Sequence, residues 1–376
     1  MIIMKKYEKM FEPFTFPSGV TIQNRILMAP MTTVSAFENG MVTKDELDYY
    51  AKRSGSVGAI ITACAYVEKT GKAFFGAFSA DSDKMIPGLS KLAQSIQKKG
   101  SKAILQIFHG GRMVSPKMIG GETPVSASAV PAVREDAVTP REMSGEEVEA
   151  VIRGFGEATR RAVQAGFDGV EIHGANTYLI QQFFSPHSNR RTDQWGGTLE
   201  KRMNFPLAVV ESVIDNVKQH SSKPFVVGYR ISPEELEEPG ITLEDTFQLV
   251  DQLAEKNLDY IHLSLNEIWR ESIRNENETQ PVLERLQKRI GHKMPLIGVG
   301  SIKNADQVVE AIDKGIPLVA VGRALILDPD WVTKIQNGQE ETIRQKISSR
   351  DIEELEIPEP MWEGFESFPG WIPIEE

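Results

Sequence analysis

Three polar residues in the middle of the chain have the types and spacing to bind an oxygen atom and to donate a proton. They are the candidate catalytic residues His173, Asn176 and Tyr178, which follow an apolar run. A histidine and an asparagine three residues apart in one turn can donate two N–H groups to a single oxygen. A phenol, with a reference pKa of about 10, stays protonated at neutral pH and can deliver a proton. For His173, a structural role in satisfying buried backbone groups is the alternative.

Two glycine-containing turns late in the chain indicate a phosphate site. They are Gly298-Val299-Gly300-Ser301 and Val321-Gly322-Arg323-Ala324. Many barrels bind phosphate after their seventh and eighth strands through backbone N–H groups, and the Arg323 guanidinium adds a fork for phosphoryl oxygens. Glycine is common at strand ends, so either turn alone is weak. Together, Gly300, Ser301, Gly322 and Arg323 predict a cofactor that carries a phosphate.

These residues follow short apolar runs that alternate with helical patterns, as in βαβ units around a parallel sheet. The eight runs are Arg25–Pro30, Gly58–Thr62, Ala103–Phe108, Gly169–His173, Phe225–Ile231, Tyr260–Ser264, Pro295–Gly300 and Pro317–Gly322. Nearly continuous apolar strands are typical of a sheet buried on both faces. We therefore predict an α/β protein, a (β/α)8 TIM barrel with its active site at the carboxyl ends of the strands. An open doubly wound sheet is the structural alternative.

Helix starts and two irregular stretches complete the outline. Thr43, Ser144 and Thr242 are expected N-caps, and the helix that begins after Ser144 is expected to end at Gly166. Residues 109–141 form a long excursion after the third strand, as a lid would. The tail, residues 350–376, holds enough aromatic residues that we expect it to pack on the barrel or on a partner. We predict one domain over residues 1–376.

Composition narrows the class of protein. The 42 basic and 53 acidic side chains give a net charge of −11, which argues against a nucleic-acid or anionic-membrane partner. Cys64 is the single cysteine, so no intramolecular disulfide, cysteine-based zinc site or iron–sulfur cluster is expected. No apolar run is long enough to span a bilayer. We expect a cytoplasmic protein without a metal, and a homo-oligomer stays open.

The stretch from Leu179 to Arg202 closely resembles the signature of the Old Yellow Enzyme family. The resemblance extends along nearly the whole chain and implies FMN as cofactor. Ala29, Pro30 and Met31 would then lie along the flavin ring, with Thr32 at its N5/O4 edge. Gln106 resembles the glutamine that binds the pyrimidine edge, and Arg230 the arginine near N1 and O2. For Arg230, a structural ion pair is the alternative, and we expect Asn189, Arg190, Asp193 and Arg202 to form a supporting scaffold.

Three departures from the family pattern concern the site. Cys64 stands where the family often has an acidic residue, and either lies close to the flavin or is inert packing. Val34 stands where one subgroup has a substrate-contacting tyrosine. In the same subgroup, a tail arginine reaches into the site of the neighbouring subunit. This tail has no arginine after Arg350, so that contact cannot be carried over.

The resemblance implies an FMN-dependent ene-reductase. NADPH or NADH would give hydride to flavin N5 in the first half of a ping-pong cycle, and an α,β-unsaturated carbonyl compound would take it in the second. His173 and Asn176 would hold the carbonyl oxygen, while Tyr178 protonates the α-carbon. A quinone reductase or NAD(P)H oxidase on the same fold is one alternative. The other is a non-redox phosphate-binding lyase, for which the sequence offers no clear Schiff-base lysine.

Overall fold

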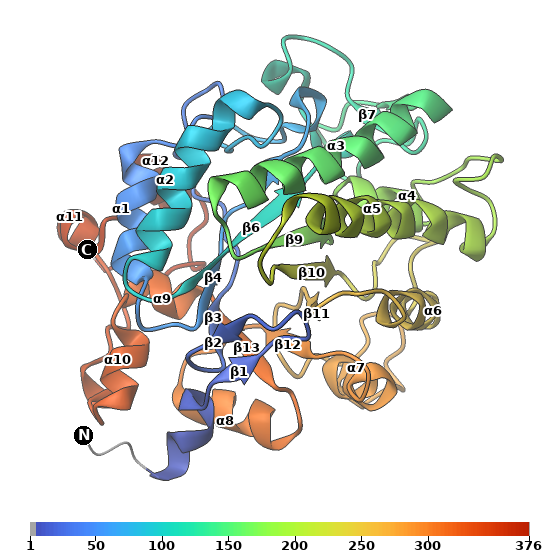
Figure 1. The fold of residues 1–376 in the computed structure, drawn as a ribbon. Helices are drawn as coiled ribbons and strands as arrows, with labels where there is room; N and C mark the ends of the chain where they lie inside the picture. The colour runs from blue at the N-terminus through green and yellow to red at the C-terminus, as the bar shows by residue number, and fades with distance from the viewer. Residues whose placement is uncertain (1–4, 376) are drawn as a thin grey trace.

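Eight parallel strands close into a barrel in the computed structural model, which describes residues 5–375 (Figure 1). Neighbouring strands pair in chain order, and pairing of β4 with β6 and of β13 with β3 completes the ring. The barrel strands are β3 (Ile26–Met28), β4 (Ala59–Ile61), β6 (Lys102–Phe108), β9 (Gly169–Gly174), β10 (Val226–Ile231), β11 (Tyr260–Leu263), β12 (Leu296–Val299) and β13 (Leu318–Val321). Each lies within two residues of a predicted run. The barrel prediction is confirmed, and the open-sheet alternative is wrong because the sheet closes.

Helices surround the strands, as Figure 1 shows. The principal ones are α1 (Lys44–Arg53), α2 (Ile86–Gln97), α3 (Gly145–Ala165), α5 (Leu199–His220), α6 (Leu243–Ala254), α7 (Val282–Ile290) and α8 (Ala305–Asp313). The predicted caps are confirmed. Ser144 and Thr242 form capping boxes, Thr43 accepts a hydrogen bond from the Glu46 N–H, and Gly166 ends α3 with a left-handed φ of 88°. These caps satisfy backbone groups that a helix end leaves without partners.

Shorter helical elements occupy the connections and the tail. They are α4 (Leu179–Phe184), α9 (Arg323–Leu327), α10 (Trp331–Gln336), α11 (Ile352–Leu355) and α12 (Glu359–Ser367). The 3₁₀ turns are Lys5–Phe11, Lys69–Gly71, Asp83–Met85, Gly111–Met113, Pro116–Met118, Glu340–Thr342 and Ser349–Asp351. The tail packs on the barrel as expected, since Trp362 and Phe365 are buried, but Phe368 and Trp371 remain 71% and 41% exposed.

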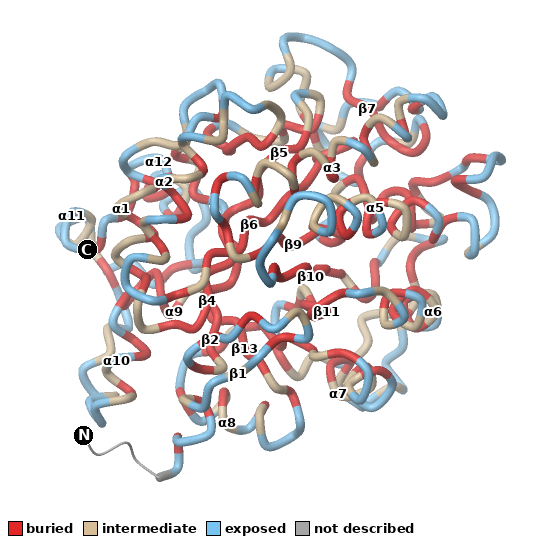
Figure 2. Tube along the Cα trace, viewed as in Figure 1, coloured by how far each residue is buried: buried red, intermediate tan, exposed pale blue. Residues whose placement is uncertain are grey.

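A hairpin that the sequence analysis did not predict closes the amino-terminal end of the barrel. It pairs β1 (Phe14–Thr15) with β2 (Thr21–Ile22), and its Phe16, Val20 and Ile22 pack against the apolar residues inside the barrel. Figure 2 shows the barrel strands as buried and the peripheral loops as exposed. Apolar side chains fill this end of the barrel interior, and the active site of a barrel is expected at the opposite, carboxyl end.

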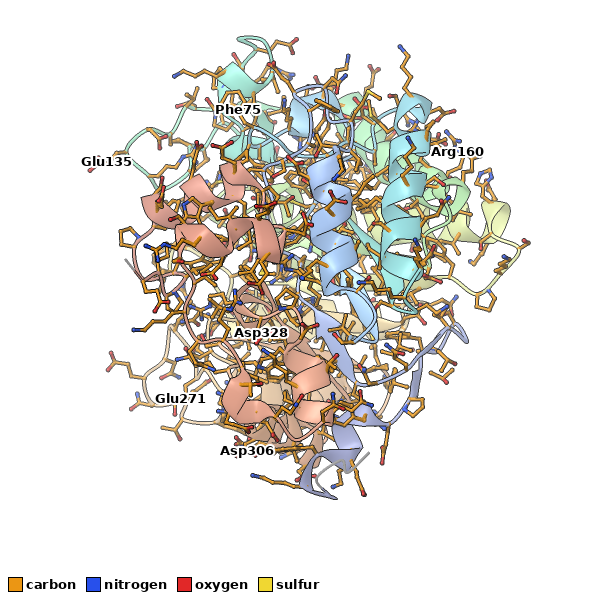
Figure 3. The ribbon with its side chains drawn as sticks, turned by 90° about the vertical axis from the view of Figure 1, so that its left-hand side faces the viewer. Phe75, Glu135, Arg160, Glu271, Asp306 and Asp328 are labelled. Atoms are coloured by element: carbon orange, nitrogen blue, oxygen red, sulfur yellow. The ribbon has the colours of Figure 1, made fainter. Side chains whose placement is uncertain are left out.

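The loops after the strands gather at that carboxyl end. Glu135 from the excursion and Glu271 from the loop after β11 lie toward the same side of the molecule in Figure 3. The excursion, residues 109–141, is not a free loop. The strands β7 (Val125–Ser126) and β8 (Arg141–Glu142) pair across it, and Arg112 Nη1 donates to the Pro131 carbonyl at 2.9 Å. The remaining strand, β5 (Ala65–Tyr66), extends the sheet beside β6. One domain over residues 1–376 stays a prediction, with residues 1–4 and 376 outside the described part.

Candidate active site

Polar side chains form two layers inside the carboxyl end of the barrel. Strand pairing places Gln106 beside Glu171, and Glu171 beside Gly228 and then Tyr260, in the lower layer. Two residues further along each strand, His173 lies beside Arg230 and Arg230 beside His262. Side chains two residues apart on a strand point to the same face. The barrel thus brings together residues from four strands whose positions in the sequence span more than 150 residues.

A hydrogen-bonded network centred on Glu171 fills the lower layer. Its Oε1 accepts from Gln106 Nε2 at 2.7 Å, and its Oε2 accepts from the Tyr260 hydroxyl at 3.0 Å and from His262 Nδ1 at 2.9 Å. Glu171 and His262 are fully buried. Gly228 makes this geometry possible, because a Cβ there would stand 2.0 Å from Tyr260 Cζ. Sequence reasoning missed Glu171, Tyr260 and His262, although a charged residue inside a buried strand was a usable signal.

His173 is held as a neutral donor. The Ala175 N–H donates to its Nδ1 at 3.3 Å, so the ring proton of the neutral form resides on Nε2. Burial, together with the nearby charge of Arg230, lowers the pKa of His173 to about 3. A neutral imidazole with a free Nε2–H can donate to a substrate oxygen over the whole physiological pH range.

Asn176 lies at the rim, in a left-handed conformation with φ 56°. Its Oδ1 accepts from the Ser264 hydroxyl at 2.7 Å, and its backbone N–H donates to Ser232 Oγ at 2.9 Å. Because the carbonyl oxygen of the amide is occupied, the Nδ2 group is left as a donor. Asn176 makes no hydrogen bond to His173 within the described part of the chain; the loops after β10 and β11 orient it instead.

Tyr178 packs directly against His173. The two rings meet edge to face with centroids 5.0 Å apart, and the Phe108 ring lies 5.0 Å from the Tyr178 ring and 6.4 Å from the His173 ring. Burial raises the pKa of Tyr178 well above its usual value, so the phenol keeps its proton. Cys64 belongs to the same apolar cluster, and burial raises the pKa of its thiol to about 12. A thiol of this kind is not a nucleophile at neutral pH.

A cavity of about 720 Å³ opens beside these layers. Eight of the predicted cofactor residues line it: Ala29, Pro30, Met31, Arg230, Gly300, Ser301, Gly322 and Arg323. Thr32, Cys64, Gln106 and the three candidate catalytic residues do not line it. Arg230 borders the cavity and lies beside His173 in the barrel. It therefore links the residues that line the cavity to the candidate catalytic residues. Ligand sites of small cofactors fall in this range of volumes.

The two predicted glycine turns form one wall of the cavity. A Cβ on Gly300, whose φ is 134°, would stand 2.5 Å from the Glu267 carbonyl carbon, and one on Gly322 would stand 3.2 Å from Met31 Sδ. At Gly300 only glycine allows the backbone to pass this closely, whereas at Gly322 the Met31 side chain would have to shift by a few tenths of an ångström. Arg323 Nη2 donates to Ser301 Oγ at 2.6 Å, which joins the two turns. Lys303 and Arg344 add positive charge to the lining, and Gly370, Trp371 and Pro373 of the tail close its outer side. The sequence analysis had not placed these residues in the site.

The segment after Tyr178 is the scaffold that was predicted. Asn189 Nδ2 donates to the carbonyls of Phe183 and Trp195, and Arg202 donates to those of Phe184 and Gly197. Arg190 and Asp193 also make hydrogen bonds within the segment. The alternative role for Arg230, a structural ion pair, finds no support, since no described carboxylate lies within 4.0 Å of its guanidinium.

The closed barrel with a polar carboxyl end defines an α/β-barrel protein, and the chain belongs to the NADH:flavin oxidoreductase / NADH oxidase family, whose model matches residues 9–342. It is 48% identical over 99% of both chains to the probable NADH-dependent flavin oxidoreductase YqiG of Bacillus subtilis. It is 47% identical to the NADH:fumarate oxidoreductase of Klebsiella pneumoniae over 96% of this chain, but spans only 39% of that longer protein. The structure of the Old Yellow Enzyme homologue from Zymomonas mobilis superposes with a TM-score of 0.77 at 25% identity, over 88% of this chain and 93% of the other.

These findings confirm the predicted membership of the Old Yellow Enzyme family, and the protein is an oxidoreductase. The hypothesis of a non-redox lyase is therefore wrong. Within residues 5–375, no helix has both the length and the apolar composition needed to cross a membrane.

Proposed function

We propose that this protein is an FMN-dependent ene-reductase that uses NADH to reduce an alkene conjugated to a carbonyl group. The observation that carries the proposal is the packing of a protonated Tyr178 against a neutral His173 whose Nε2–H is free. This pair supplies a proton and an oxygen-binding donor at one place. NADH is favoured as reductant because the descriptions of the family and of the relatives from Bacillus subtilis and Klebsiella pneumoniae all specify it.

The residues of the cavity fit FMN. The glycine turns leave room for close backbone approach, and Arg323 offers a fork for phosphoryl oxygens. Arg230 Nε is buried without a hydrogen-bond partner among the described residues, so the site holds a donor that a ligand would satisfy. Gln106 donates its amide N–H to Glu171, which leaves its carbonyl oxygen as an acceptor. When bound, FMN would supply hydride transfer, taking hydride from the nicotinamide and passing it to the alkene in a ping-pong cycle.

The protein's own residues would then complete the reduction. His173 Nε2 and Asn176 Nδ2 donate to the carbonyl oxygen and stabilise the negative charge that hydride addition at the β-carbon places there. Tyr178 transfers its phenolic proton to the α-carbon and is reprotonated by solvent. One hydride and one proton thus add across the C=C bond, and the carbonyl group is unchanged.

The test is a visible spectrum of the purified protein followed by anaerobic titration with NADH and, separately, NADPH. A flavin band that NADH bleaches, and that returns when cyclohexenone is added, is the expected result. A colourless protein that cannot be reconstituted with FMN would overturn the proposal. Steady-state rates with cyclohexenone, a quinone and oxygen distinguish an ene-reductase from a quinone reductase or NADH oxidase, because an ene-reductase alone turns over the enone at a substantial rate.

A further inference from the structure

The buried carboxylate of Glu171 has no part in the chemistry proposed above. It lies inside the barrel with no exposed surface and takes hydrogen bonds from Gln106, Tyr260 and His262. Burying a carboxylate is costly unless donors and positive charge compensate it. Three donors from β6 and β11 converge on one carboxylate here, at the level of the barrel just below His173 and Arg230.

Glu171 determines which way the Gln106 carboxamide faces. A carboxylate accepts hydrogen bonds and donates none, so Gln106 must present its NH₂ group to Glu171 Oε1, 2.7 Å away. The carbonyl oxygen of Gln106 is then held away from Glu171 as an acceptor. The pyrimidine edge of a flavin carries one N–H between two carbonyl groups, and an acceptor fixed in this way matches that N–H. A glutamine without such a partner could turn either end toward the ligand.

Glu171 also balances the positive charge of Arg230. Arg230 is 8% exposed, lies one strand away from Glu171 and two residues nearer the carboxyl end, and forms no ion pair among the described residues. Burial works to raise the pKa of Glu171, but the neighbouring His262 and Arg230 outweigh it and hold the carboxylate ionised. A fixed negative charge on the neighbouring strand therefore offsets the cation that borders the cofactor cavity.

We propose that Glu171 is a positioning residue for the cofactor: it fixes Gln106 with its carbonyl oxygen toward the flavin and offsets the charge of Arg230, and so sets how strongly the site favours reduced over oxidised flavin. The inference rests on the proposed function, because it takes FMN as the occupant of the cavity. Glu171 acts through Gln106 and Arg230 and is not in contact with substrate.

The decisive measurement is the midpoint potential of the flavin in the holoenzyme, with the dissociation constant of FMN measured beside it. Glu171→Gln keeps the shape of the side chain and removes the charge. The field of Arg230 is then unopposed, so binding of reduced relative to oxidised flavin should strengthen about tenfold, a rise of about 30 mV for a two-electron couple. Oxidised FMN should bind more weakly, because the amide introduced at 171 donates to Gln106, whose own NH₂ group then faces the flavin N–H.

An exchange variant, Gln106→Glu combined with Glu171→Gln, separates positioning from structural support. It retains the whole network: the new amide at 171 donates to the carboxylate at 106, and its oxygen accepts from Tyr260 and His262. Thermal stability should return to that of the wild type. The potential should fall below the wild-type value, because the negative charge now faces the flavin. Tyr260→Phe is the matched control, since it removes one neutral donor, and its potential should stay close to the wild-type value.

The outcomes separate this inference from the proposed function. If the wild-type protein takes up no FMN, the proposed function fails and this inference fails with it. If the wild type takes up FMN and Glu171→Gln has the wild-type potential, the inference alone is wrong. It is also wrong if the exchange variant recovers stability and potential together. Should Glu171→Gln fail to fold, the exchange variant decides the question alone, because its network is intact.

Discussion

At the residue scale, two neighbouring rings must each stay uncharged for the proposed reaction. Tyr178 must keep its proton until it transfers it, and His173 must remain a neutral hydrogen-bond donor. Burial serves both, because it disfavours the phenolate and the imidazolium alike. The Ala175 N–H then selects the tautomer of His173, and the edge-to-face contact holds the phenol beside it. The position of each ring in the fold therefore determines its role: His173 is the hydrogen-bond donor and Tyr178 is the proton donor.

Tyr178→Phe should reduce the rate of alkene reduction by a factor on the order of 10² to 10⁴, the usual contribution of a positioned general acid. FMN content and the rate of flavin reduction by NADH should be little changed, because the proposed role of Tyr178 is to protonate the alkene and not to hold the cofactor. Stopped-flow measurement of the two half-reactions checks both statements. Tyr66→Phe is the matched control: it removes another phenol of the same cluster, whose hydroxyl donates to the Asn39 carbonyl. Loss of flavin from Tyr178→Phe would contradict the assigned role.

Glu46 gives a second prediction at this scale. Burial raises its pKa to about 8, while the Thr33 hydroxyl donates to Oε1 at 2.7 Å. The folded protein therefore holds a proton that the unfolded chain releases above its ordinary pKa of 4.5. The stability that this proton contributes is fully present below pH 4.5. As the pH rises, that contribution falls by about 1.4 kcal/mol per pH unit until the pH passes the pKa of the folded state.

The side chain of Glu46→Gln cannot ionise. The unfolding free energy of this variant, relative to that of the wild type, should therefore rise by this amount per pH unit between pH 4.5 and about 8. Chemical unfolding at intervals across that range, with the two proteins in the same state of flavin loading, gives the difference directly. Other buried groups titrate in both proteins and cancel in the comparison. Parallel stability curves for the two proteins would show that Glu46 does not hold a proton in the folded state.

At the scale of elements, the strands could be predicted because each is an apolar run bounded by polar or glycine residues, and the helices because Thr43, Ser144 and Thr242 cap them. The β1–β2 hairpin could not be, since two strands of two residues carry no periodic signal. The short helices of the tail were also missed, because the proline-rich composition of that segment predicts an irregular chain. The Glu171 network needed closure of the barrel to bring Gln106, Tyr260 and His262 within hydrogen-bonding distance. Resemblance suggested Ala29, Pro30, Met31 and Arg230, which line the cavity, and it could not locate Trp371, whose place depends on the path of the tail.

The residue at position 228 in β10 is constrained by a side chain of the neighbouring strand β11. A Cβ at Gly228 would overlap the Tyr260 ring, so Gly228→Ala should push that ring away from Glu171. The cost of such overpacking is about 1 to 3 kcal/mol of unfolding free energy, and FMN affinity should fall with it. Urea unfolding and FMN titration measure the two effects. Gly364→Ala in α12, where no atom lies within 4 Å of the added methyl, is the control and should be neutral or slightly stabilising.

At the scale of the whole molecule, an early and a late segment of the chain meet at one cavity. Ala29, Pro30 and Met31 line it from the first barrel strand, and Gly370, Trp371 and Pro373 line it from the tail. The tail is held there by pairing of Ile347 with Ile374 and by Arg323, whose Nη1 donates to the Trp371 carbonyl at 3.4 Å. A cofactor in this cavity would contact both segments, so its binding should stabilise the fold as a unit.

FMN at about 1,000 times its dissociation constant should add about 4 kcal/mol to the unfolding free energy, seen as a higher Tm. Trp371→Ala should speed FMN release and shrink that gain, while leaving the Tm of the apoprotein nearly unchanged, because the side chain is already 41% exposed. Phe368→Ala is the control, since Phe368 is 71% exposed and does not line the cavity. Thermal unfolding of the three proteins, each with and without FMN, separates the effects. An equal loss of Tm with and without FMN in Trp371→Ala would mean that the tail supports the fold and does not retain the cofactor.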